Sequence, residues 1–158
     1  MSTTVEMTFQ GGGLRDKDVA AGASIAATKL IHEQTIVQNV FASATTIAAA
    51  TTPLYICRSD TAEIVDCEAI VFGAASGDRT VTITLQKSTG GGAFASIMSS
   101  TIDIDNTVAV RTAISGVISD VDLEIGDVLQ VVTAVGGASG TQPTGLTVAL
   151  TVRTRPVA

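Results

Sequence analysis

The sequence predicts an all-β fold, an antiparallel β-sandwich, on three observations. Eight or nine short segments rich in Val, Ile and Thr follow from His32 onward, with turn residues every 8–14 residues, as in sandwiches. No segment has a convincing helical period, because Thr45, Thr46 and Ile47 oppose helix formation in the Ala-rich stretch 42–50. Charged residues make up 15% of the chain, against about 25% in ordinary globular proteins.

Length and composition favour one domain whose surface is polar but uncharged. The 158 residues are enough to bury a sizeable core. Thr, Ser, Ala and Gly take the place of charged residues, which indicates sheets with neutral outer faces. Another subunit can cover such faces without burying unpaired charge. Composition therefore favours an assembly protein, and a plain β-sandwich is the alternative.

Residues 1–31 differ from the rest of the chain. The stretch "GGGLRDKDVAAGAS" (11–24) combines three glycines, a small charge cluster and small residues, with a period of neither 2 nor 3.6. We expect residues 1–31 to form an extended N-terminal arm with one short strand at Thr4–Phe9, and a flexible tail is the alternative. The sandwich domain is expected over residues 32–158.

The first half of the sandwich is predicted to contain four strands. They are expected at residues 33–41, 45–52, 53–59 and 63–74. A short polar turn, Asp60–Thr61–Ala62, separates the last two, which predicts a β-hairpin.

The second half alternates more regularly. In "RTVTITLQKS" (79–88), Val81, Ile83 and Leu85 share one face, and Thr and Gln residues share the other, as in a half-buried strand. A glycine-rich turn (89–94) follows. Further extended segments are predicted at 95–105, 107–116, 127–135 and 145–154. The segment 107–116 alternates through Val108, Val110, Thr112 and Ile114. The segment 145–154 places Leu146, Val148, Leu150 and Val152 on one face.

Two predicted strands are apolar on both faces, although a sandwich strand needs only its inner face apolar. Ile70, Val71 and Phe72 run together, and the second case lies at 128–135. We interpret Ile70, Phe72, Val128 and Val132 as a candidate subunit interface, and a loop or the arm covering the outer face is the alternative. These strands predict a trimer.

Charge and hydropathy argue against nucleic-acid and membrane binding. The net charge is −6, the nine Lys and Arg residues are scattered, and there is no Trp and one Tyr, so a basic patch with stacking aromatics is missing. The uncharged runs 34–57 and 128–152 are interrupted by polar residues and Pro, which leaves no apolar span of about 20 residues. The N-terminus lacks the basic and apolar regions of a secretory signal, so we expect the chain to be made and used inside a cell, or to be carried out of it within something larger.

The residues that carry chemistry form no catalytic group. His32 is the single histidine, no serine lies in a G-x-S-x-G context, and a surface role for His32 is expected. Cys57 and Cys67 with one histidine cannot make a four-ligand zinc site. In the predicted hairpin they would face each other, which permits but does not require a disulfide; in a reducing cytosol two buried thiols are the default.

The acidic stretch "SDVDLEIGD" (119–127) superficially resembles a calcium loop. Its glycine is one place too late for an EF-hand, and Val121, Leu123 and Ile125 alternate with the acids. We expect a strand with an acidic outer face that turns at Gly126–Asp127. The glycine loops lack a phosphate-loop context. No catalytic residue, metal or cofactor is therefore expected, and the chain is not expected to be an enzyme.

Residues 79–152 resemble a known family of virion proteins. "TVTITLQKSTGGGAFASIMSSTIDI" and "LEIGDVLQVVTAVGGASGTQPTGLTVALTV" resemble jelly-roll domains of bacteriophage virion proteins, in which a Val/Thr strand ends in a Leu-x-Lys-type step and a Gly loop. A later "GD-x-L-x-V" strand precedes a loop and a final "GL-x-V-x-L" strand. The best match in size is the capsid decoration (cement) proteins of tailed phages, and the resemblance covers about half of the chain.

The resemblance implies a jelly-roll-like antiparallel β-sandwich of about eight strands with an extended N-terminal arm. It implies a homotrimer on the capsid surface of the virion, made in the host cytoplasm, with the major capsid protein as partner. Cement proteins often reach a neighbour through an N-terminal arm, and Phe9, Leu14, Arg15 and Lys17 are the candidate contacts here. Head-fibre and tail-fibre knobs share the pattern, so a host-surface-binding module is the alternative.

Overall fold

The structure is a computed structural model that describes residues 31–59 and 62–154. The predicted strand at Thr4–Phe9 and the candidate arm contacts Phe9, Leu14, Arg15 and Lys17 lie outside the described residues. The first of the described strands, β1, begins at His32, where the sandwich domain is predicted to start.

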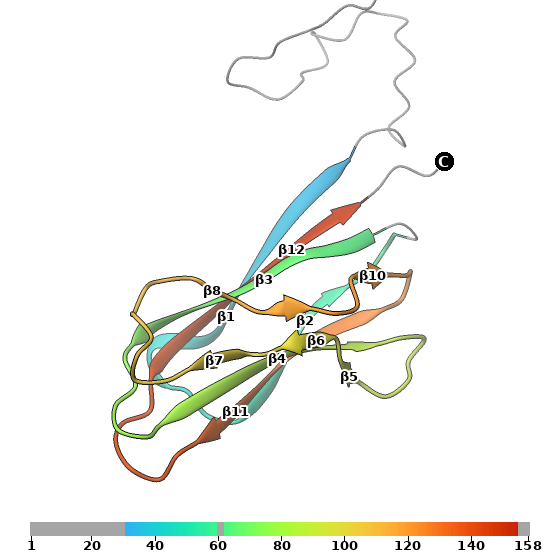
Figure 1. The fold of residues 1–158 in the computed structure, drawn as a ribbon. Helices are drawn as coiled ribbons and strands as arrows, with labels where there is room; N and C mark the ends of the chain where they lie inside the picture. The colour runs from blue at the N-terminus through green and yellow to red at the C-terminus, as the bar shows by residue number, and fades with distance from the viewer. Residues whose placement is uncertain (1–30, 60–61, 155–158) are drawn as a thin grey trace, which may run out of the picture.

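The described chain forms an antiparallel β-sandwich of two main sheets (Figure 1). Sheet A contains, in spatial order, β1 (His32–Thr46), β12 (Thr144–Thr154), β3 (Ala62–Gly73) and β10 (Asp122–Leu123), with β8 (Ile114–Ser115) also paired to β3. Sheet B contains β2 (Ala50–Ile56), β11 (Val128–Gly136), β4 (Thr80–Ser88) and β5 (Ala95–Ser96), with β7 (Ile102–Ile104) also paired to β4. A small third sheet pairs β6 (Met98–Ser100) with β9 (Val117–Ile118).

The strand pairs are nested along the chain. β1 pairs with β12, β2 with β11, β3 with β10 and β8, and β4 with β7 and β5. This is the pairing of one long hairpin rolled up so that successive pairs fall in alternate sheets, which is the jelly-roll arrangement. The predicted all-β, jelly-roll-like sandwich is therefore confirmed. Between β4 and β11, the described chain forms six short strands, β5 to β10, in place of two long strands.

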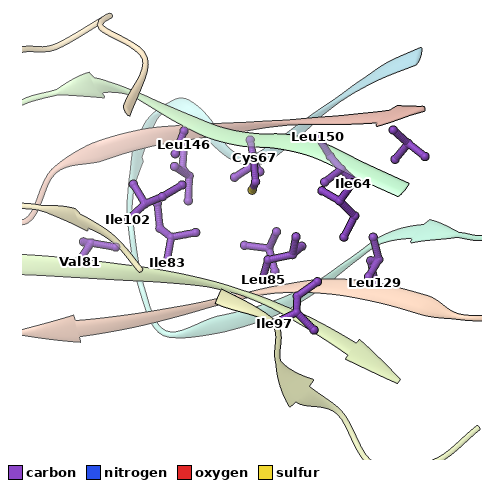
Figure 2. Packing of buried hydrophobic residues seen from close by; sticks show 14 of the residues in the cluster. Ile64, Cys67, Val81, Ile83, Leu85, Ile97, Ile102, Leu129, Leu146 and Leu150 are labelled. Atoms are coloured by element: carbon purple, nitrogen blue, oxygen red, sulfur yellow. The ribbon is translucent and has the colours of Figure 1, made fainter. Parts of the chain in front are cut away.

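The core lies between the two sheets (Figure 2). Val81, Ile83 and Leu85 of β4 point toward sheet A and are fully buried, as their alternation predicts. The predicted inward face of β12 is buried as well, at Leu146, Val148, Leu150 and Val152. Each such side chain contributes about 1.5–3 kcal/mol by leaving water, so the two inner faces dominate the stability of the fold.

The predicted hairpin between residues 53–59 and 63–74 is wrong. β2 lies in sheet B beside β11, whereas β3 lies in sheet A beside β12. Cys57 N donates to Asp127 O at 2.8 Å, and Gly126 N donates to Cys57 O at 3.0 Å, so the chain stays tied to sheet B just past β2. A short polar connection can join two strands of the same sheet or of different sheets. Here the pairing of β2 with β11 and of β3 with β12 places the two strands in different sheets. Cys57 and Cys67 are both buried free thiols.

Two other predicted strands have different bounds. The segment 45–52 is broken, because β1 ends at Thr46 and the buried Ile47 donates its N–H to Pro143 O before β2 begins at Ala50. Of the segment 107–116 only Ile114–Ser115 is strand. The Asp105 carboxylate accepts hydrogen bonds from Thr107 N and Thr107 Oγ1 at 2.8 and 2.6 Å. The chain therefore turns at Asp105, and residues 107–113 do not form the predicted strand.

Candidate functional site: the outer faces of the sandwich

The outer face of sheet B is made by the outward side chains of its three long strands, β2, β11 and β4. Because side chains alternate along a strand, Leu129 and Val131 of β11 point into the core while Val128, Gln130 and Val132 point outward. The register places three rows across the face: Thr51–Val132–Thr84, Pro53–Gln130–Gln86 and Ile56–Val128–Ser88. We call these rows the neutral face.

The neutral face presents no charged side chain in any of its three rows. β2, β11 and β4 together contain a single charged residue, Lys87. Lys87 sits opposite Leu129, its side chain is 13% exposed, and it forms an ion pair with Asp120. Another protein surface could therefore cover this face without desolvating an unpaired charge.

A shallow apolar depression lies where the neutral face meets the edge of the sheet. It is lined by Pro53, Leu54, Tyr55, Ile56 and Val128. β2 carries a bulge here, because Tyr55 pairs with Leu129 and Pro53 with the next residue, Gln130, which leaves Leu54 between them. Ile56 is 50% exposed, so a large apolar side chain borders the depression in contact with water.

The middle row of the neutral face is polar but satisfied within the sheet. Gln130 Nε2 donates to Gln86 Oε1 at 2.9 Å across β11 and β4. An amide carries two donors and an acceptor, so the pair retains hydrogen-bonding capacity toward a covering surface. The face thus offers apolar contact at Val132, Val128 and Ile56, and directional polar contact at the glutamine pair between them.

The outer face of sheet A is charged at one end. Arg153 of β12 bridges its two neighbouring strands, with Nη2 3.0 Å from Glu33 Oε2 and Nη1 3.3 Å from Glu63 Oε1. Both carboxylates raise the pKa of the Arg153 guanidinium, and the hydrogen bonds that Arg153 donates to Glu33 have the largest effect. Glu68 lies further along β3 and accepts a hydrogen bond from Ser115 Oγ at 3.3 Å.

The four candidate interface residues divide between the two faces. Val128 and Val132 lie on the neutral face of sheet B. Ile70 and Phe72 lie on the outer face of sheet A, where Ile70 pairs with Thr147 and Phe72 is 39% exposed. Since the two sheets pack with their inner faces together, the structure places the two pairs on opposite sides of the sandwich and does not join them in one surface.

Neither cysteine has the surroundings of a reactive thiol. Burial raises the pKa of the Cys67 thiol to about 12, and the carboxylates of Asp66 and Glu68 add to that shift. The Cys57 thiol donates to Ser59 O at 3.1 Å. A thiol must ionise and be reached by a reagent to act as nucleophile or ligand, and Cys67 is kept from both.

The acidic stretch is used to shape a turn. Gly126 has φ +90°, and the buried Asp127 accepts the N–H of Glu124 at 3.0 Å, which confirms the predicted turn at Gly126–Asp127. Asp120 is the partner of Lys87, and only Asp122–Leu123 forms strand. Within residues 31–59 and 62–154, no three His, Cys, Asp or Glu side chains gather as metal ligands would.

His32, the single histidine, is exposed and opens β1 opposite Thr154. In the part of the chain that the structure describes, no helix is long and apolar enough to span a bilayer.

Comparisons with known proteins give one structural match. No protein-family model matches the chain, and no curated protein shows significant similarity to it. Among solved structures, it is similar to a chain titled Desmodium yellow mottle tymovirus, with a TM-score of 0.31 and 10% sequence identity over 99% of this chain and 98% of that chain.

Proposed function

We propose that this protein is a virion structural protein, a capsid decoration (cement) protein of a tailed bacteriophage. It binds the outer shell as a trimer, bridges neighbouring major capsid proteins and stabilises the head without catalysing a reaction. Its location is the capsid surface, and it is made in the host cytoplasm. No nucleic acid, membrane or cofactor takes part.

The observation that carries the proposal is the neutral face on a jelly-roll sandwich. Jelly rolls serve as viral capsid and lectin domains, among others. A face without charge can be covered at little desolvation cost, whereas a catalytic role needs clustered polar groups. The sequence resemblance of residues 79–152 to phage virion proteins supports the same function, and this segment runs from β4 to β12.

The proposed mechanism is stabilisation by binding. A bound trimer that bridges capsomers must lose its contacts before the shell can rupture. At a hundredfold excess over the dissociation constant, binding stabilises each site by about 2.7 kcal/mol. Many sites on one shell raise the temperature at which it ruptures. Because a neutral face contributes few exposed charges, binding should depend only weakly on salt.

The test is the integrity of capsids with and without the protein. Particles are heated or osmotically shocked at low and high salt, and genome release is measured. Decorated particles are expected to survive to a higher temperature at both salt concentrations. Equal survival of bare and decorated particles contradicts the cement function and favours the alternative, a head-fibre or tail-fibre knob that binds a host surface.

A truncation tests the arm. We propose that residues 1–31, through Phe9, Leu14, Arg15 and Lys17, contact the shell. Removing residues 1–24 is expected to weaken binding to particles while leaving the melting temperature of the sandwich nearly unchanged, because β1 begins at His32. Binding of the truncated protein with unchanged affinity would exclude the arm as a contact.

A further inference from the structure

We propose that the neutral face of sheet B, together with the adjoining β2 edge, is the surface through which copies of this chain contact one another in the trimer. The inference rests on the proposed function for the trimer itself and adds which surface forms it. The occupant is a second copy of the same chain, which places its own surface on this face.

The charge of the chain favours this face for contact between copies. Each copy has a net charge of −6, so a surface shared between copies should carry few carboxylates. The outer face of sheet A carries Glu33, Glu63 and Glu68, and Arg153 neutralises only part of that charge. The three rows of the neutral face carry none, and the one carboxylate beside them on the described part of β4 and β7 is the exposed Asp103, which accepts a hydrogen bond from Thr82 Oγ1 at 2.7 Å in the next row. Sheet B therefore brings fewer like charges to a second copy than sheet A does.

The placement of the two candidate pairs on opposite faces argues against their simultaneous use in a closed ring. Ile70 and Phe72 on sheet A face away from Val128 and Val132 on sheet B. A head-to-tail contact between opposite faces repeats in a straight line and gives an open filament, whereas a closed ring needs two surfaces inclined to each other. A face and its adjoining edge meet this requirement.

The β2 edge supplies the inclined surface. β2 pairs with β11 on one side and is the last strand of its sheet. Pro53 removes a backbone donor, and the bulge at Leu54 interrupts the ladder, so β2 is a poor template for strand addition. Contact there is therefore made by side chains, and the depression between Pro53 and Ile56 can receive an apolar side chain from the neutral face of the next copy.

The test compares matched charge substitutions on the two faces. Val132 and Ala149 both lie on inner strands of their sheets, point outward and are half-buried. The variants are Val132→Glu and Val132→Lys, with Ala149→Glu and Ala149→Lys as controls. Mass is measured by light scattering across micromolar concentrations, and circular dichroism melting checks that each variant is folded.

We expect both Val132 variants to raise the concentration at which the trimer dissociates by at least tenfold, regardless of the sign of the charge, while both Ala149 variants remain trimers. Ile56→Glu at the edge should act like Val132→Glu, and its 50% exposure makes it tolerable to the fold. If folded Val132 and Ile56 variants remain trimers, the neutral face is not the contact surface, and the trimer of the proposed function still stands. A wild-type protein that is a monomer both in solution and on particles would instead overturn the trimer of the proposed function.

Discussion

Asp78 joins two loops at one end of the sandwich. Its carboxylate accepts hydrogen bonds from Ser139 N at 2.6 Å, Ser139 Oγ at 3.1 Å and Ala138 N at 3.2 Å. The bonds from the Ser139 and Ala138 backbone hold the pKa of the carboxyl below its usual value. Nothing in the sequence pattern singled out Asp78, because its partners are about 60 positions away.

The depressed pKa makes this link sensitive to acid. A group whose pKa is lower in the folded state stabilises the fold above its unfolded pKa, about 3.9, and loses that contribution as the pH falls through the folded value. We expect Asp78→Asn to reduce the loss of stability between pH 5 and pH 2 in urea titrations. Asp122→Asn is the control, since no described group donates to that carboxylate. A wild-type pH profile in Asp78→Asn would contradict this role.

A second prediction concerns the buried thiols. Since the pKa of Cys67 is raised to about 12 and the side chain is 1% exposed, it should not react with a thiol reagent at pH 8 while the protein is folded. In the variant Cys57→Ser, which leaves Cys67 as the single thiol, labelling should appear only with unfolding in urea. Rapid labelling of the native variant would show that the site opens locally.

At the scale of the element, the loop after β11 depends on glycine geometry. Gly137 and Gly91 both have φ +77°, a conformation that favours glycine. A Cβ at Gly137 would lie 2.1 Å from Asp78 O, whereas nothing lies within 4 Å of a Cβ at Gly91. The two positions share the backbone strain and differ in the space around them.

Alanine substitutions separate these two effects. Gly91→Ala is expected to cost about 1–2 kcal/mol from the left-handed backbone alone. Gly137→Ala should cost about 1–3 kcal/mol more, because the loop must move away from Asp78 O. Urea denaturation measures both, and equal losses would mean that the loop moves without cost.

The long strands were predictable, and their partners were not. β4 and β12 were recognised because period-2 alternation is a local property of residues such as Val81, Ile83 and Leu85. The hairpin from 53 to 74 was wrong because turn chemistry does not say which sheet receives the next strand. The segment 107–116 alternates as a strand would, yet the Asp105 side chain turns the chain before it can pair.

The neutral face was predictable only in part, because alternation along one strand is a local property and the rest of the face comes from other strands. Val128 and Val132 stood out because they add apolar residues to the outward side of a strand whose inner side is already apolar. Their neutral surroundings come from Thr51, Thr84 and Gln86, which lie on other strands. The contrast with the charged face of sheet A therefore appears only when the strand order is known.

At the scale of the whole molecule, the nested pairing makes nearly every sheet contact non-local. Proteins dominated by such contacts fold in milliseconds to seconds, since loop closure precedes any stabilising contact. We expect stopped-flow refolding in this range, slower than for helical proteins of equal length. Refolding complete within microseconds would contradict this expectation.

The same pairing has a consequence during synthesis. Glu33 in β1 and its partner Arg153 in β12 are 120 positions apart. At 5–20 residues per second, a ribosome needs roughly 6–24 s to make the chain between them. Among the described strands, β1 is translated first and pairs only with β12, which is translated last. β1 therefore stays available to chaperones or to other nascent chains until β12 has been made.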